Sequence, residues 1–201
     1  MKVKELEEYI RSELMKVDGD ELAFIQLTGK EERLIRDKTA YAMYRDGMVV
    51  KREHKYIDIV TFQDDNYSDL IEFSLFYTWD LLQEKMYMNK NGIFAKLTKD
   101  KTKLANFPIA VNKFMVLCIL HPRRDKELEL FEKENLFSYP QFFDKFLMNK
   151  YDEIPLIGFN RIKNDFYHNI LDEAISHFKM EFGVYRATQL NMYFWIIPII
   201  K

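Results

Sequence analysis

Two carboxylates interrupt apolar stretches that have the character of β-strands. Asp58 lies between two isoleucines, and Glu72 lies between Ile71 and Phe73. A carboxylate that faces a sheet interior is costly unless something pairs with it, and a hard divalent cation is a natural partner for its oxygens. Such a cation also activates water for attack on phosphorus. Strand alternation is the alternative, with both carboxylates pointing to solvent. The pattern alone favours neither interpretation.

The surroundings of these two acids resemble the PD-(D/E)XK nuclease superfamily over about residues 28–120. The shared features are the order helix, three strands, helix, strand, with an acid on the first helix, Asp58 on the second strand and Glu72 on the third. The resemblance implies a restriction-endonuclease-like αβββαβ core in which Asp58, Glu72 and either Glu31 or Glu32 hold Mg²⁺ or Mn²⁺. It implies metal-dependent hydrolysis of DNA, with Asp58 and Glu72 as catalytic residues.

Ser74 departs from the family pattern because it occupies the position of the lysine in the E-x-K tripeptide. A hydroxyl cannot supply the positive charge that stabilises a phosphoryl transition state. Either another residue takes that role, or the chain is a catalytically inactive nuclease-fold module for DNA binding or protein assembly. Lys38 is our candidate for a displaced catalytic lysine, since it follows Glu31 by two helical turns. The alternative is a lysine whose stem packs while its ammonium reaches water.

Basic residues in two segments could contact nucleic-acid phosphates. We interpret the first segment, which contains Asn, Gly and Thr, as a loop, and the second follows a predicted central strand. A lysine-rich loop that is merely solvated is the alternative. The formal net charge of −2 argues against binding nucleic acid through bulk charge. The candidate residues are Lys96, Lys99, Lys101, Lys103, Arg123 and Arg124.

Other common chemistries lack their motifs. The single cysteine, Cys118, allows neither an internal disulfide nor a cysteine zinc site, and we expect it buried in a reducing compartment. His168 and His177 do not have the spacing of zinc ligands. No phosphate-binding glycine loop or nucleophile elbow is present, so we expect no nucleotide cofactor.

Periodicity predicts the elements that position the two acids. Residues 2–17 have helical spacing, and a capping box from Thr28 to Glu31 predicts a second helix over residues 29–45. Three strands follow over residues 48–54, 56–62 and 69–77, with a polar turn at 63–68. Residues 78–88 become helical again, and residues 111–120 are apolar on both sides, as in a central strand.

Beyond residue 122 we expect helices near 125–135, 139–149 and 161–182. The β-branched and aromatic segment 192–200 predicts a final strand that pairs at the sheet edge or with a second subunit. A homodimer is plausible because a small nuclease that cuts both DNA strands needs two sites.

The predicted fold class is α/β, with a mixed central sheet flanked by helices and a helical C-terminal extension. We expect one domain over residues 1–201: an N-terminal helix (1–27), the nuclease-like core (28–125) and the extension with its final strand (126–201). No apolar run approaches the length of a membrane span, so we expect no membrane partner. The first residues carry no apolar leader, and cytoplasmic localisation is the expectation.

Overall fold

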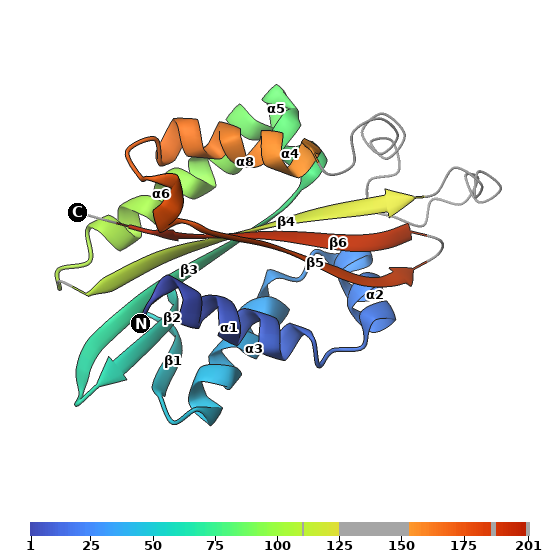
Figure 1. Cartoon of the computed structure of the whole chain (residues 1–201). Helices are drawn as coiled ribbons and strands as arrows, with labels where there is room; N and C mark the ends of the chain where they lie inside the picture. The colour runs from blue at the N-terminus through green and yellow to red at the C-terminus, as the bar shows by residue number, and fades with distance from the viewer. Residues whose placement is uncertain (110, 125–152, 186–187, 200–201) are drawn as a thin grey trace.

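The computed structural model describes residues 1–109, 111–124, 153–185 and 188–199. It is a mixed α/β structure with a six-stranded, mostly antiparallel sheet between two layers of helices (Figure 1). The predicted mixed sheet with flanking helices is therefore confirmed. The helices predicted near 125–135 and 139–149 lie outside the described residues.

The sheet has the strand order β1-β2-β3-β4-β6-β5. Neighbouring strands are antiparallel except β3 and β4, which are parallel. A parallel pair needs a long crossover, and the helices between β3 and β4 provide it. The bounds are β1 Val49–His54, β2 Ile57–Gln63, β3 Asn66–Tyr77, β4 Asn112–Arg124, β5 Ser176–Tyr185 and β6 Thr188–Pro198.

Each face of the sheet is covered by its own group of helices (Figure 1). One layer contains α1 Val3–Leu14, α2 Gly19–Gly29 and α3 Glu32–Arg45. The other contains α4 Thr78–Leu82, α5 Glu84–Met88, α6 Ile93–Ala105 and α8 Glu153–Phe166, followed by the 3-10 helix Asp172–Ala174. Side chains of β4 alternate between the two cores, Val116 and Cys118 on one side, Leu117 and Ile119 on the other. The prediction of a central strand that is apolar on both faces is confirmed.

Two tight hairpins join the first three strands. Lys55 and Tyr56, with φ of 52° and 65°, connect β1 to β2, and Asp64 and Asp65, with φ of 48° and 61°, connect β2 to β3. Two central residues with positive φ match the right-handed twist of the paired strands. The polar turn predicted over residues 63–68 is therefore too long, since β3 already begins at Asn66.

The N-terminal third contains one helix more than predicted. Helix α2 ends at Gly29, and Lys30 follows in the left-handed conformation with φ of 54°. The Thr28 hydroxyl donates to the carbonyl of Phe24, 2.7 Å away, inside this last turn. The predicted capping box at Thr28 is therefore wrong, and the next helix begins at Glu32.

The C-terminal prediction also needs correction. The helix predicted over residues 161–182 ends at Phe166, and the chain continues into β5, where the buried side chains of Ser176, Phe178 and Met180 alternate with more exposed ones. The final strand, β6, lies between β4 and β5 and is paired on both sides. It is therefore not a sheet edge, and it offers no free edge to a second subunit. The homodimer stays a prediction without this support.

Candidate functional site

Glu72 and Ser74 occupy the interior of the molecule beneath α6. Along β3 the side chains of Ile71 and Phe73 join the core beneath α1–α3. By strand alternation, Glu72 and Ser74 point to the opposite face. Glu72 is 2% exposed and Ser74 is 0% exposed. The alternative in which Glu72 points to solvent is therefore wrong.

Helix α6 brings a lysine to the buried Glu72. The Lys103 Nζ lies 2.7 Å from Glu72 Oε1 and 3.6 Å from Asp100 Oδ1. The same ammonium donates to the carbonyl oxygen of Tyr56 at 2.7 Å. Asp100 is buried and accepts a hydrogen bond of 3.2 Å from the hydroxyl of Ser74. The segment that we predicted to be a lysine-rich loop is this helix, and its regular repeat brings Lys103 into the site.

The electrostatics of this pair follow from its burial. Burial raises the pKa of Glu72 to about 8, and the charge of Asp58 adds to the increase, while Lys103 opposes it. Burial acts to lower the pKa of Lys103, but Glu72, Asp100 and Asp58 outweigh it and raise that pKa. Lys103 therefore stays protonated at neutral pH, and the proton on Glu72 is exchangeable near it.

Asp58, the second residue of β2, lies beside the edge of β3 just beyond the last residue pair that joins these two strands. The last β2–β3 pair toward this end is Ile59 with Ile71, so the amide of Phe73 has no β2 carbonyl opposite it. Asp58 Oδ2 accepts a hydrogen bond from this amide at 2.8 Å. Asp58 Oδ1 lies 3.6 Å from a guanidinium nitrogen of Arg36, a residue that the sequence did not indicate.

Two further carboxylates continue this row along β3. Glu32 Oε2 accepts from the amide of Leu75 at 2.8 Å, and Asp80 Oδ2 accepts from the amide of Tyr77 at 3.1 Å. Alternate amides of a strand point to the same side, so three carboxylates occupy one free edge. Each acid thus has a structural role, because an unpaired buried amide would be costly.

The helix acid that approaches the sheet is Glu32. Its Oε2 also lies 2.7 Å from Lys96 Nζ, whereas Glu31 is exposed at the helix N-cap. Lys38 is half-buried, and no hydrogen bond or ion pair joins it to another of the described residues. It lies about 200° around α3 from Arg36, at about 100° per residue, so the structure does not bring it to this cluster.

Asp58 and Glu72 are two carboxylates whose charges act on each other, since the charge of Asp58 raises the pKa of Glu72. Glu72 Oε1 is buried and, apart from the Lys103 ion pair, has no hydrogen-bond partner. Glu32 contacts β3 two residues further on, about 7 Å along a strand, so it does not complete the set. Within the described ranges, no group of three or more His, Cys, Asp and Glu side chains could hold a metal ion. Any ion at Asp58 and Glu72 would therefore take its remaining ligands from water or substrate.

The predicted phosphate-binding residues do not form one surface. Lys96 pairs with Glu32, Lys101 donates to the carbonyl of Phe166, and Lys99 is exposed on α6. Arg123 and Arg124 belong to the end of β4, beside β6 rather than α6.

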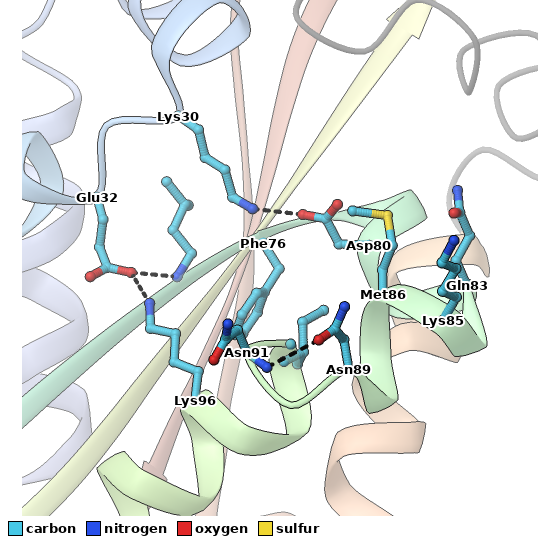
Figure 2. A pocket seen from close by; sticks show the side chains of 13 residues that line it. Lys30, Glu32, Phe76, Asp80, Gln83, Lys85, Met86, Asn89, Asn91 and Lys96 are labelled. Carbon is cyan, nitrogen blue, oxygen red and sulfur yellow. Dashed lines mark hydrogen bonds and ion pairs between the residues drawn. The ribbon is translucent and has the colours of Figure 1, made fainter.

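A cleft of about 780 Å³ adjoins the row of carboxylates at the C-terminal end of β3. Figure 2 shows two ion pairs in it, Lys30 with Asp80 and Lys96 with Glu32, on either side of Phe76. Glu32 and Lys96 therefore belong both to the carboxylate row and to the cleft lining. Neither Lys30 nor Asp80 was recognisable in the sequence, because the two partners lie 50 positions apart.

No family model, curated protein or solved structure matches this chain. None of the helices in the part of the chain that the structure describes combines the length and apolarity required to span a membrane.

Proposed function

We propose that the protein is a metal-dependent deoxyribonuclease with a restriction-endonuclease-like core. The core would consist of α3, β1–β3, α6 and β4, with Asp58 and Glu72 as ligands of Mg²⁺ or Mn²⁺. The observation that carries the proposal is the 2.7 Å contact between Lys103 Nζ and Glu72 Oε1. It puts a positive charge beside the two acids although Ser74 occupies the E-x-K position.

Each residue of the site has a distinct role in this proposal. Lys103 carries the fixed positive charge that stabilises the charge developing on a phosphodiester. Asp100, held by Ser74 at 3.2 Å, positions α6 against β3. The cation, when bound, would polarise the phosphate and make a water molecule more acidic. Binding requires Glu72 to lose its proton, so we expect cation affinity to rise as pH approaches about 8.

The β1–β2 turn is joined to the site by a hydrogen bond. Lys55 and Tyr56 both have positive φ, which costs about 1–2 kcal/mol per residue for side chains other than glycine. Lys103 holds the carbonyl of Tyr56 at 2.7 Å, two residues before Asp58. This hydrogen bond connects the turn before Asp58 to α6, the helix that carries the proposed cationic residue.

The test is cleavage of plasmid and branched DNA with Mn²⁺. We expect products from the wild type and from the control Asp65→Asn, which changes an exposed aspartate of the β2–β3 turn. We expect none from Asp58→Asn, whose amide oxygen can still accept from Phe73, and none after chelation. Absence of cleavage on every DNA form, or cleavage unchanged in Asp58→Asn, would sink the proposal.

A second candidate is a catalytically inactive module that binds DNA or assembles with protein. The observation in its favour is that Asp58, Glu32 and Asp80 all accept backbone amides of β3, which gives these acids a purely structural role. A melting scan discriminates the two. The nuclease predicts a rise in Tm with Mn²⁺ that is lost in Asp58→Asn, whereas the module predicts no rise. The inactive module also predicts a DNA gel shift that persists when a chelator removes the metal.

A further inference from the structure

The cleft beside the carboxylate row holds cations from three separate elements. Lys30 follows α2, Lys85 lies on α5, and Lys96 lies on the first turn of α6. The volume of about 780 Å³ is within the usual range for small-molecule sites. The cleft therefore has the size and the charged groups to hold an anionic ligand of moderate size.

Two of these ammonium groups converge on one aromatic ring. Lys30 Nζ lies 5.9 Å from the centroid of the Phe76 ring, and Lys96 Nζ lies 5.5 Å from it (Figure 2). Lys85 is exposed at the same cleft. Converging positive charges favour a dianion over a monoanion, because each ammonium can contact a different oxygen.

The ion pairs in the cleft leave both lysines able to turn toward a ligand. Lys30 pairs with Asp80 at 2.6 Å, and Lys96 pairs with Glu32 at 2.7 Å. Both carboxylates also accept backbone amides of β3, so they keep a donor when the ammonium moves. Exchange of one oxygen partner for another therefore leaves no buried charge without a donor.

The start of α6 adds further donors at the same place. Gly92 is its N-cap, no side chain caps this end, and its first turn contains no acidic residue. Both Gly92 and Ile93 line the cleft. The unpaired amides and the positive end of the helix dipole there favour an anion, in addition to the three lysines.

We propose that this cleft binds the terminal phosphate and first nucleotide of a DNA strand. A terminal phosphate monoester carries about −1.5 to −2 charges at pH 7, whereas an internal phosphodiester carries only one. Met86, Asn89 and Asn91 also line the cleft, and their side chains offer the sugar and base an apolar surface and amide groups. This inference rests on the proposed nuclease function, and it specifies a strand end as the substrate.

The test is binding of single-stranded oligonucleotides to the full chain in a chelating buffer. Binding is measured from the fluorescence anisotropy of a fluorophore placed inside the strand. We compare strands with a phosphate at either end with the same strand bearing only hydroxyls. A strand with a phosphorylated end should bind about tenfold more tightly than the hydroxyl strand, because one additional charge-assisted contact to phosphate changes the affinity by about this factor. Lys30→Gln and Lys96→Gln should remove this preference. Lys90→Gln, which changes an exposed lysine outside the cleft lining, should keep it.

Equal binding of phosphorylated and hydroxyl ends would overturn the inference, and so would a preference that survives both cleft variants. Binding of free deoxynucleoside monophosphate without binding of the strand would overturn it as well. Because the buffer contains no free divalent metal, the result does not depend on cleavage. A phosphate preference without cleavage in Mn²⁺ would contradict the nuclease alone, and cleavage without the preference would contradict the cleft assignment alone.

Discussion

Lys103 on α6 lies 2.7 Å from Glu72 on β3, and this contact joins the crossover helix to the buried centre of the sheet. One turn earlier on α6, Asp100 accepts from Ser74, and one turn earlier again Lys96 pairs with Glu32. The spacing i, i+4, i+7 puts these three α6 residues on one face of the helix. The two lysines of this face thus complement acids from α3 and β3, while Asp100 holds the helix to Ser74.

Glu72→Gln should change how stability depends on pH. The folded state raises the pKa of Glu72 from 4.5 to about 8, chiefly through burial, so between these values the folded chain holds a proton that the unfolded chain has lost. The contribution of this group to the unfolding free energy is full below pH 4.5 and is lost as pH rises toward about 8. In urea unfolding in a chelating buffer, the unfolding free energy of the variant should rise relative to that of the wild type by a few kcal/mol as pH increases over this window.

The control for this series is Glu173→Gln, which changes an exposed carboxylate in the 3-10 helix. A stability difference between Glu72→Gln and the wild type that stays constant across the window would show that Glu72 does not titrate as the structure implies.

Asp69→Asn should destabilise the protein at neutral pH by about 2 kcal/mol, because a buried carboxylate loses charge-assisted donors. Burial acts to raise the pKa of Asp69, but the Met1 amino group, Thr61, Asn112 and Ser68 outweigh it and lower that pKa. Stability from this group is therefore present above its ordinary pKa and is lost as pH falls through the lower folded value. Chemical unfolding at several pH values should show the difference shrinking in acid.

The matched variant is Asp65→Asn, which changes an exposed aspartate in the preceding turn. If Asp69→Asn unfolds at the same urea concentration as Asp65→Asn at neutral pH, the donors around Asp69 do not stabilise its charge.

Gly92→Ala should disrupt the turn before α6. A Cβ at this position would lie 2.2 Å from the carbonyl oxygen of Met86, and the backbone there is already closed by a 2.7 Å hydrogen bond from Gly92 to Asn89. Because a backbone oxygen cannot move aside cheaply, we expect a loss of about 2 kcal/mol or more in urea unfolding. Gly47→Ala is a useful contrast, since a Cβ there meets nothing within 4 Å and only its φ of 89° opposes the substitution. Wild-type stability in Gly92→Ala would contradict this packing.

The acids of the site were predictable from the sequence, and Lys103 was a candidate for contacting phosphate, but its pairing with Glu72 was not predicted. Glu72 was recognisable because it interrupts an apolar strand, a pattern that depends only on neighbouring residues. Lys103 reaches it across 31 positions of sequence, and the lysine- and threonine-rich composition of its segment suggested a loop. The regular spacing of Lys96, Asp100 and Lys103 was the signal for a helix. Lys38 lies on a helix as expected, but the direction of its side chain depends on how this helix, α3, packs against the sheet.

The C-terminal half shows a different limit. A row of apolar residues from Ile162 onward fits helical spacing, yet the buried residues Phe178 and Met180 fit strand alternation equally well. Pairing with β6 decides between helix and strand for this segment. The same pairing makes β6 an internal strand of the sheet, because β5 lies at its outer edge. Such long-range pairing is not encoded in local periodicity.

In the proposed nuclease, Lys103 acts with Asp58 and Glu72 on a phosphodiester. This role is tested by the rate of DNA cleavage in Mn²⁺ by the wild type, Lys103→Met and Lys38→Met, with folding checked by circular dichroism. Glu72 can take up a proton when the Lys103 ammonium is removed, so Lys103→Met should stay folded. We expect the cleavage rate of Lys103→Met to fall roughly 10²–10³-fold, as for removal of one transition-state contact. Cleavage at the wild-type rate by Lys103→Met, or a loss confined to Lys38→Met, would contradict it.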